Sequence, residues 1–259
     1  MKIIVVQSGS KGNATLVIDE GRVLLIDMGV TLKVLKDALK KENLNIMNIS
    51  AMLLTHEHWD HTVGIKYLPP LPIYCTEETY DKSNVEVIEP YKKFKIDHFE
   101  ITPISTSHDV NNPLGFVIKN KQEKLVFLTD SGKIPGKSLQ KMKNADYYLI
   151  ESNHDVDMLL ATNRPWYLKH RILSDKGHLS NEQSASYICK CVGEKTKQII
   201  LMHLSEEANH PDVALKTYKK IFKDAKISTK KIEIKCANQH YSVIGGLKWI
   251  TKNLKTIKK

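Results

Sequence analysis

Short apolar runs that end in polar clusters recur along the chain and predict buried strands. The expected strands cover residues 2–7, 14–19, 22–27, 51–55, 73–75, 93–96, 99–105, 114–119, 125–129, 147–151, 198–202 and 231–236. Helical patterns predict helices over residues 32–41, 182–192 and 211–223, a short helix near 137–142 and helical pieces between 156 and 176. The chain therefore opens in the order β-β-β-α-β.

Local signals support these element ends. Thr31 and Ser180 precede helical patterns and are expected to cap them, and Pro211 suits the first turn of a helix. The pair Glu20 and Gly21 between two apolar runs indicates a hairpin turn. The uncharged run 51–55 is expected to be a central strand of an α/β sheet, whose carboxyl end is the usual place for chemistry.

The composition is that of a globular protein. The chain has 259 residues, of which 41% are hydrophobic and 26% charged, enough for one large domain over residues 1–259. No transmembrane segment is expected, and the apolar run after Met1 is too short for a signal peptide, so a cytoplasmic protein without a membrane partner is predicted. The four cysteines show no paired framework and are expected to be reduced thiols.

The formal net charge is +10, which favours an anionic partner such as nucleic acid. The charge comes mainly from lysine, because only three of the 39 basic residues are arginines (Arg22, Arg164 and Arg171). Lysine-rich composition can reflect the genome rather than the function, so the charge alone leaves the partner open. The lysine-rich tail after residue 247 is most simply a solvated face.

Three histidines and an aspartate crowd the end of the run 51–55. The motif reads His56-Glu57-His58-Trp59-Asp60-His61. Side chains two residues apart in an extended segment point to the same side, so His56 and His58 can share one ion, while Asp60 and His61 can hold a second. Imidazole and carboxylate ligands suit zinc, manganese or iron. The alternative, a solvated polar loop, explains this density of histidines poorly.

Further candidate ligands stand where other apolar runs end. His108, Asp130 and His203 each follow an expected strand, and Asp27 ends another. In this order, together with the six-residue motif, they resemble the motifs of the metallo-β-lactamase superfamily over essentially the whole chain. The implied fold is an αβ/βα four-layer sandwich, in which two mixed sheets carry helices on the outside and a dinuclear metal site at one edge.

Within that superfamily the sequence resembles the WalJ/YycJ branch of metal-dependent 5′-exonucleases. The resemblance rests on the stretches 9–13, 151–155, 171–181 and 202–207. Trp59 departs from the pattern, since a small residue is expected there, and this leaves substrate contacts more open than metal binding. The resemblance implies DNA as the partner and two divalent ions as cofactors, either zinc or manganese, or else iron.

The resemblance also implies roles for individual residues. His56, His58 and His108 would hold one metal, Asp60, His61 and His203 the other, and Asp130 both. Asp60 would in addition orient the attacking water. His178, oriented by Glu151, would protonate the leaving oxygen. The expected substrate contacts are Ser8, Ser10, Asn13, Ser107, His154, Arg164, Lys169, His170 and Arg171.

Three classes of function remain in view. The first is a two-metal 5′-exonuclease on DNA, in which the ions activate water for in-line attack on a phosphodiester. The second is a hydrolase of small molecules, such as a cyclic phosphodiesterase or a thioesterase, or an RNA-processing nuclease. The third is a non-catalytic nucleic-acid-binding protein, which the complete ligand set disfavours. Oligomeric state, polarity of digestion and metal identity are not predicted.

Overall fold

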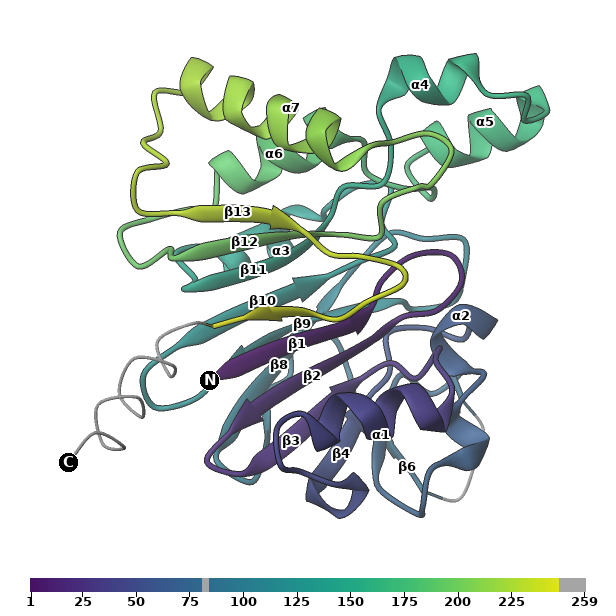
Figure 1. The fold of residues 1–259 in the computed structure, drawn as a ribbon, viewed down its shortest axis with the longest axis vertical. Helices are drawn as coiled ribbons and strands as arrows, with labels where there is room; N and C mark the ends of the chain where they lie inside the picture. The colour runs from purple at the N-terminus through teal and green to yellow at the C-terminus, as the bar shows by residue number, and fades with distance from the viewer. Residues whose placement is uncertain (81–83, 247–259) are drawn as a thin grey trace.

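The protein folds into two sheets of seven strands in the computed structural model, which describes residues 1–80 and 84–246 (Figure 1). The first sheet has the order β14 (Val243–Gly245), β1 (Lys2–Gln7), β2 (Ala14–Asp19), β3 (Arg22–Ile26), β4 (Ile49–Leu53), β5 (Ile73–Cys75) and β6 (Val85–Val87). The second has the order β13 (Glu233–Cys236), β12 (Gln198–Met202), β11 (Tyr147–Glu151), β10 (Lys124–Leu128), β9 (Leu114–Lys119), β8 (Phe99–Ser105) and β7 (Phe94–Ile96).

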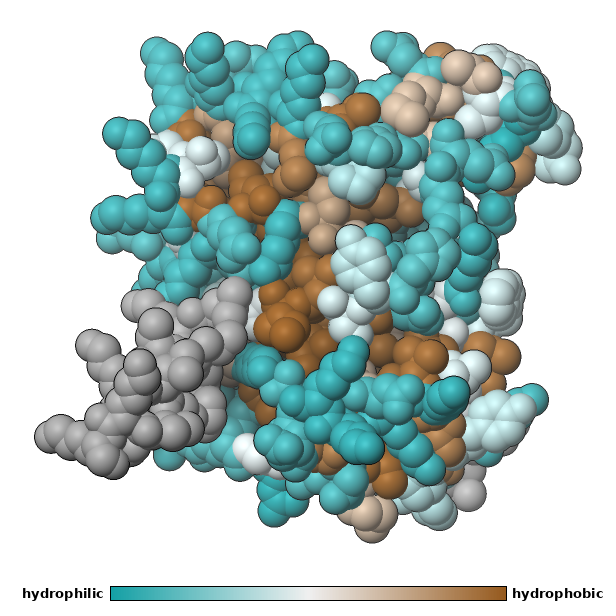
Figure 2. Space-filling model, viewed as in Figure 1, coloured by the Kyte–Doolittle hydropathy of each residue, from teal (hydrophilic) through white to brown (hydrophobic). Residues whose placement is uncertain are grey.

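Helices cover the outer faces of both sheets. The α-helices are α1 (Leu32–Lys40), α2 (Trp59–Thr62), α3 (Gly136–Met142), α4 (Val156–Ala161), α5 (Trp166–Leu173), α6 (Asn181–Cys189) and α7 (Pro211–Asp224), and the 3-10 helices are η1 (Ile46–Asn48) and η2 (Ile65–Tyr67). Figure 2 shows hydrophilic side chains over α1 and α7 and apolar ones between them, toward the sheet edges. Within the described residues, no helix combines the length and the apolar character needed to cross a membrane.

The core follows from the alternation of side chains along strands. In β1, Ile3 and Val5 pack between the two sheets, whereas Ile4 and Val6 pack on the side of α1. A third cluster joins the outer face of the second sheet to α3, α6 and α7. Because both faces of each sheet are covered, the strands read as nearly continuous apolar runs, and the predicted α/β four-layer sandwich is confirmed.

Each sheet changes from antiparallel to parallel pairing partway across. Strands β3, β4, β5 and β6 are parallel in the first sheet, and β10, β11, β12 and β13 are parallel in the second. Parallel strands end at the same edge of a sheet, so the loops after β3, β4, β10, β11 and β12 meet at one edge of the sandwich. The polar clusters of the sequence are therefore brought together there.

Most predicted elements agree with the structure, including the caps at Thr31 and Ser180. The strand predicted over 51–55 instead runs over Ile49–Leu53, because Thr55 turns away to donate its backbone N–H to Asp27. The strands β6 and β14 were not predicted, since each has only three residues and depends on a neighbouring strand for its pairing. Helix α6 ends at Cys189, so Cys191 lies beyond it, and all four cysteines are free thiols as predicted. The tail after residue 247 lies outside the described residues.

Candidate metal centre

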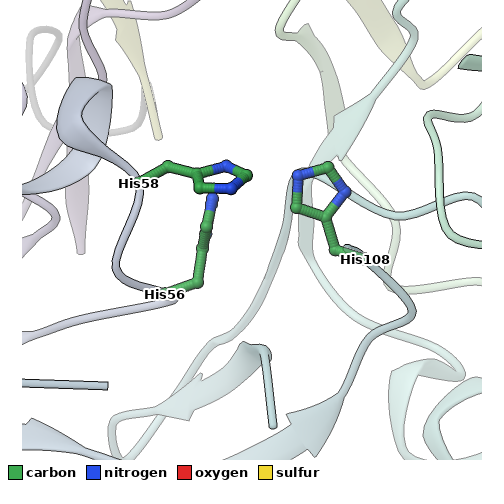
Figure 3. A group of neighbouring side chains, drawn as sticks. All are labelled: His56, His58 and His108. Carbon is green, nitrogen blue, oxygen red and sulfur yellow. The ribbon is translucent and has the colours of Figure 1, made fainter. Parts of the chain in front are cut away.

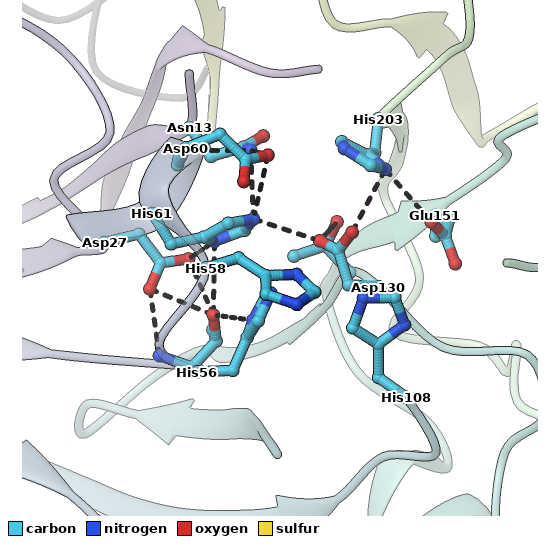
Figure 4. Close-up of polar contacts among 12 residues, drawn as sticks. Asn13, Asp27, His56, His58, Asp60, His61, His108, Asp130, Glu151 and His203 are labelled. Carbon is cyan, nitrogen blue, oxygen red and sulfur yellow. Dashed lines mark hydrogen bonds and ion pairs between the residues drawn. The ribbon is translucent and has the colours of Figure 1, made fainter. Parts of the chain in front are cut away.

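Three residues of the centre stand at strand ends in left-handed backbone conformation. Asp27 and His203 directly follow β3 and β12, and Asp130 stands two residues after the end of β10; their φ angles are 59°, 54° and 51°. This region is uncommon for residues with a side chain, and such strain concentrates at functional sites. Figure 4 shows Asp130 pointing toward His61, whereas Asp27 lies behind His61 on the side of the first sheet.

A group of three histidines forms one side of the centre. His56, His58 and His108 each have a ring nitrogen within 4.8 Å of one in the other two (Figure 3). The Nδ1 atom of His108 donates to the carbonyl oxygen of Gly177 at 3.2 Å, so Nε2 is the ring nitrogen that carries the lone pair. This is the arrangement that second-sphere contacts impose on metal-binding histidines.

The surroundings of His56 Nε2 show whether these residues fit a metal ion. The hydroxyl of Thr55 donates to Asp27, so it accepts a hydrogen bond from His56 Nδ1 at 3.0 Å. His56 Nε2 is then a lone-pair nitrogen, and it is buried without a hydrogen-bond partner among the described residues. Burial and the nearby His61 hold the pKa of His56 well below its usual range, so the ring is neutral. A buried neutral imidazole facing two others is a donor set suited to a divalent ion.

His61 is fixed from behind by a carboxylate. Its Nδ1 atom lies 2.8 Å from Asp27 Oδ2, and its Nε2 atom lies 3.6 Å from Asp60 Oδ2 and 3.3 Å from Asp130 Oδ2. Burial alone would lower the pKa of His61, but Asp27 and Asp130 hold it well above the usual value. Asn13 Nδ2 lies 3.2 Å from Asp60 and 3.0 Å from His61 and orients both.

The loop that carries Asp60 packs tightly on the glycine after β3. A Cβ atom on Gly29 would lie 1.6 Å from the carbonyl oxygen of Asp60, so only glycine fits there. The backbone N–H of Asn13 donates to the same oxygen at 2.8 Å. These contacts join the loops after β1, β3 and β4 into one support for the centre.

The second sheet contributes an acidic and imidazole group. The Oδ1 atom of Asp130 lies 3.3 Å from His203 Nδ1 and 3.6 Å from His178 Nδ1, and Glu151 Oε1 lies 3.1 Å and 2.7 Å from the same two nitrogens. Burial alone would raise the pKa of Glu151, but His178 and His203 lower it to about 2. Burial alone would lower the pKa of His203, but Asp130 and Glu151 raise it to about 9. The Glu151 carboxylate is therefore ionised at neutral pH.

Asp130 stands between the two halves of the centre. One of its oxygens faces His61 and the other faces His203, each at 3.3 Å (Figure 4). Burial alone would raise the pKa of Asp130, but His203 and His61 hold it well below the usual range. The carboxylate is thus placed to contact two cations at once.

The structure brings all seven expected ligands to this edge of the sandwich. The ring centroid of His203, which was expected beside Asp60 and His61, lies 6.5 Å from that of His61, and its Nδ1 atom lies 3.1 Å from Glu151 Oε1. Its Nε2 atom is buried and has no partner in the described part of the chain. The amide of Asn153 donates to the carbonyl oxygen of His203 at 2.9 Å and lies 3.3 Å from Nδ1, which helps to hold this orientation.

Several expected substrate contacts have structural duties. The hydroxyl oxygen of Ser8 accepts a hydrogen bond from the backbone N–H of His203, and the backbone N–H of Ser107 donates to the hydroxyl oxygen of Ser131 at 3.0 Å. The prediction of Lys169 as a substrate contact is wrong. Its side chain is buried, and its ammonium donates to the carbonyl oxygens of Leu160 and Thr162 at 2.6 and 2.8 Å. It ties α4 to α5 and is not available to a substrate.

The remaining expected contacts differ in exposure. Ser10 is exposed, and His170 packs edge-on against Trp166 at 5.0 Å between ring centroids. His154 is fully buried, and burial lowers its pKa to about 4. Arg164 pairs with an exposed glutamate, Glu207, at 2.9 Å.

Arg171 reaches the rim of the centre through a residue that the sequence did not single out. Its Nη1 atom lies 2.6 Å from Asp109 Oδ2, while Asp109 Oδ1 lies 3.2 Å from His108 Nε2 and 3.9 Å from His58 Nε2. The only local sign that Asp109 belongs to the centre is that it directly follows His108 in the sequence. Its pairing with Arg171 depends on the approach of α5, which no local pattern reveals.

Comparisons with known proteins agree with this geometry. The sequence model described as "Beta-lactamase superfamily domain" matches residues 22–204. Exodeoxyribonuclease YycJ of Bacillus anthracis is 34% identical over 225 residues, covering 81% of this chain and 84% of that protein. Exodeoxyribonuclease WalJ of Streptococcus pneumoniae is 34% identical over 228 residues, covering 82% and 85%.

A solved structure shows the same fold. The metallo-β-lactamase fold protein YhfI from Bacillus subtilis superposes with a TM-score of 0.70 at 19% identity, covering 94% of this chain and 99% of that one. The residues matched by the family model include the three-histidine group and Asp130. The chain therefore belongs to the beta-lactamase superfamily, on the branch that includes YycJ and WalJ, and is a metal-dependent hydrolase.

Proposed function

We propose that the chain is a 5′-exonuclease that hydrolyses the phosphodiester bonds of DNA with the help of two divalent ions. The observation that carries this proposal is the pairing of His178 with Glu151 beside the carboxylate of Asp130. This arrangement adds a proton donor to a metal centre, as cleavage of a phosphodiester with a poor leaving group requires. Two relatives named exodeoxyribonuclease support DNA as the substrate. We propose further that one domain, residues 1–259, carries the whole activity.

The ligand sets follow from the donor atoms. His56, His58 and His108 would hold one ion, and Asp60, His61 and His203 the other, with Asp130 contacting both. Nitrogen and oxygen donors of this kind suit zinc or manganese, and iron as a third choice. When bound, such ions supply positive charge that polarises a phosphoryl group and favours the deprotonation of water at neutral pH.

His178 acts on the leaving group. Its Nδ1 atom lies 2.7 Å from Glu151 Oε1, so the buried carboxylate accepts the Nδ1 proton and leaves Nε2 to carry the transferable one. His178 is the partly exposed member of this pair, with 15% of its side chain accessible against 0% for Glu151. Glu151 thus orients the ring, and His178 Nε2 donates a proton to the departing oxygen. Asp60, held by Asn13, orients the attacking water on the opposite side.

Cations at the rim would bind the phosphates of the strand. Arg171 is 55% exposed, and its present partner Asp109 is a carboxylate that a phosphate can replace. Arg164 is held by Glu207 in the same way on the segment before α5. Exposed ion pairs of this kind are weak, about 0–1 kcal/mol, so exchanging the carboxylate for a phosphate costs little. Ser10 and Asn13 belong to the loop between β1 and β2, and we propose that this loop contacts the substrate as well.

The test is nucleotide release from linear duplex DNA carrying a label on the 5′ phosphate of one strand or at its 3′ end. With manganese present, the 5′ label should appear first as a mononucleotide, whereas the 3′ label should stay on long products until late. Early release of the 3′ label would contradict the polarity. Faster digestion of the same sequence as RNA would move the substrate to RNA, and cleavage of a chromogenic diester without digestion of DNA would move it to a small molecule.

The His178→Ala variant adds a test of mechanism. It should lose most of its rate on DNA, about 100-fold or more, while keeping more of its rate on a diester whose leaving group needs no proton. Equal losses on both substrates would remove the proposed proton-donor role. Metal content should not change, because His178 is not among the proposed ligands.

A further inference from the structure

Helix α5 exposes two neighbouring aromatic side chains. Trp166 and Tyr167 are 63% and 76% accessible, among the highest values for large apolar side chains in the described residues. Burial of such rings would stabilise the fold, so exposed neighbouring rings indicate a binding surface. Figure 1 shows α4 and α5 together at the end of the sandwich toward which the parallel strands point.

The pair α4 and α5 is held in one orientation. Leu159 from α4 packs with Leu168 and Ile172 from α5 and with Ala208 from the loop before α7. Lys169 adds two hydrogen bonds to carbonyl oxygens at the end of α4. Residues 168, 169 and 172 thus define the inner face of α5, and the directions of its other side chains follow from helical geometry.

Tyr167 lies on the same face of α5 as Arg171, which contacts the rim of the metal centre. Residues four apart on a helix share a face, with β carbons about 5–6 Å apart, so Tyr167 lies one turn from Arg171. Arg171 contacts Asp109 at 2.6 Å, and Asp109 in turn lies 3.2 Å from His108 Nε2. Arg171 therefore connects the face of α5 that carries Tyr167 to the rim of the centre.

Trp166 lies on a different face. It pairs with His170, its own neighbour four residues on, at 5.0 Å between ring centroids. The Trp166 ring also has the Lys169 ammonium 6.0 Å from its centroid, so both of these partners of Trp166 lie on α5 itself. The two exposed rings of α5 are thus separated by about 100° around the helix, which makes one a matched control for the other.

We propose that Tyr167 stacks on a base of single-stranded DNA whose phosphate binds Arg171. An aromatic ring one turn from a guanidinium suits one nucleotide, which offers a flat base and an anionic phosphate to the two side chains. Inside a duplex the faces of a base are covered by its neighbours, so only an unpaired or frayed strand can present one. This inference rests on the proposed function. It extends that function, because it requires the DNA strand to be unpaired where it contacts α5.

The experiment is binding of a fluorescent single-stranded oligonucleotide to the full chain in the presence of a chelator, which separates binding from hydrolysis. Tyr167→Ala should weaken binding about 5- to 100-fold, the range for loss of one stacked base, while Tyr167→Phe should bind like the wild type. Trp166→Ala and Met47→Ala, which also shorten exposed large side chains, should bind within about twofold of the wild type. Met47 lies before β4, at the end of that strand away from the metal centre.

Oligonucleotides with one abasic residue complete the test. With the missing base at the position that meets Tyr167, one of the first three nucleotides, the wild type should bind as weakly as Tyr167→Ala, and the variant should lose nothing more. Melting temperatures of all variants should agree, because the side chains are exposed. Equal binding by wild type and Tyr167→Ala, or a loss confined to Trp166→Ala, would overturn the inference.

The outcome is separable from that of the proposed function. If the wild type digests DNA with metal but Tyr167→Ala binds and digests it equally well, only the stacking inference fails. If the wild type neither binds nor digests DNA, the proposed function fails as well. Preference for blunt duplex over single strands in the binding assay would also contradict the inference.

Discussion

The two sides of the metal centre are built in different ways. On the inner side, the side chains of His61 and Asp27 are completely buried, and Asp130 is 4% accessible. On the outer side, Asp109 and Arg171 are 27% and 55% accessible. The inner contacts join strand ends that the core already fixes, whereas the outer contacts join a surface loop to α5.

This difference indicates a division of labour. Inner residues are held by several hydrogen bonds each, as Asp27 is by His61 and by both donors of Thr55. Such a preorganised shell holds ligands for ions and resists exchange. Outer residues are held by single exposed ion pairs, which a substrate phosphate can replace at little cost. We therefore expect inner substitutions to change metal content and outer ones to change substrate binding.

The largest effect is expected from Asp130→Asn on the inner side. Loss of the charge that faces both His61 and His203 should reduce metal content and lower the hydrolysis rate by more than about 100-fold. Metal analysis and nucleotide release measure both effects. Asp146→Asn is the matched control, a buried aspartate at the start of β11, away from the centre. Unchanged metal content in Asp130→Asn would contradict the division.

A smaller loss is expected from Asp27→Asn. The variant keeps a hydrogen-bonding group beside His61 and Thr55 but removes the charge, so metal affinity should fall about 10- to 100-fold. Excess metal should restore much of the activity, which can be followed by titrating metal into the chelated variant. Failure of excess metal to rescue a folded variant would show that Asp27 acts by some route other than ion affinity.

The outer side is tested by Arg171→Ala. Metal content should match the wild type, while KM for DNA should rise several-fold and the slope of log affinity against log salt should fall by about one. Arg22→Ala is the control, because Arg22 is also exposed in an ion pair but starts β3, away from the centre. A loss of metal in Arg171→Ala would show that the two sides are not separate.

The smallest effect is expected from Lys169→Met. Two carbonyl oxygens at the end of α4 would lose their buried donor, which should cost about 1–3 kcal/mol of local stability. Hydrogen exchange should quicken in α4 and α5 but not in the strands, and DNA binding should weaken slightly. Unchanged exchange in both helices would mean that Lys169 does not fix the position of Arg171.

The inner side was the more predictable part of the molecule. Apolar runs located the strands, and the polar residues after them, such as His56, Asp130 and His203, marked where each strand ends. Parallel pairing brings those ends to one edge, and the resemblance to the metallo-β-lactamase superfamily identified which of the polar residues are expected ligands. The short strands β6 and β14 could not be predicted, because their pairing depends on neighbours far along the chain.

The outer side could not be predicted in the same way. Lys169 carries a positive charge that could bind a phosphate. Its actual partners, the carbonyl oxygens of Leu160 and Thr162, are brought to it only by the packing of α4 against α5. Asp109 likewise gains its role from the approach of Arg171 across 62 positions of sequence. Composition predicts which side chains are charged, whereas packing decides which charges remain free.

The central claim, that a metal centre in this chain digests DNA from the 5′ end, is tested most directly by metal removal and return. Chelated protein is given linear DNA labelled on its 5′ phosphate, first without metal and then with added manganese or zinc. The account predicts no release of labelled mononucleotide until metal is added, and release afterwards. Digestion that is indifferent to the chelator, or none with any of the metals, would contradict it.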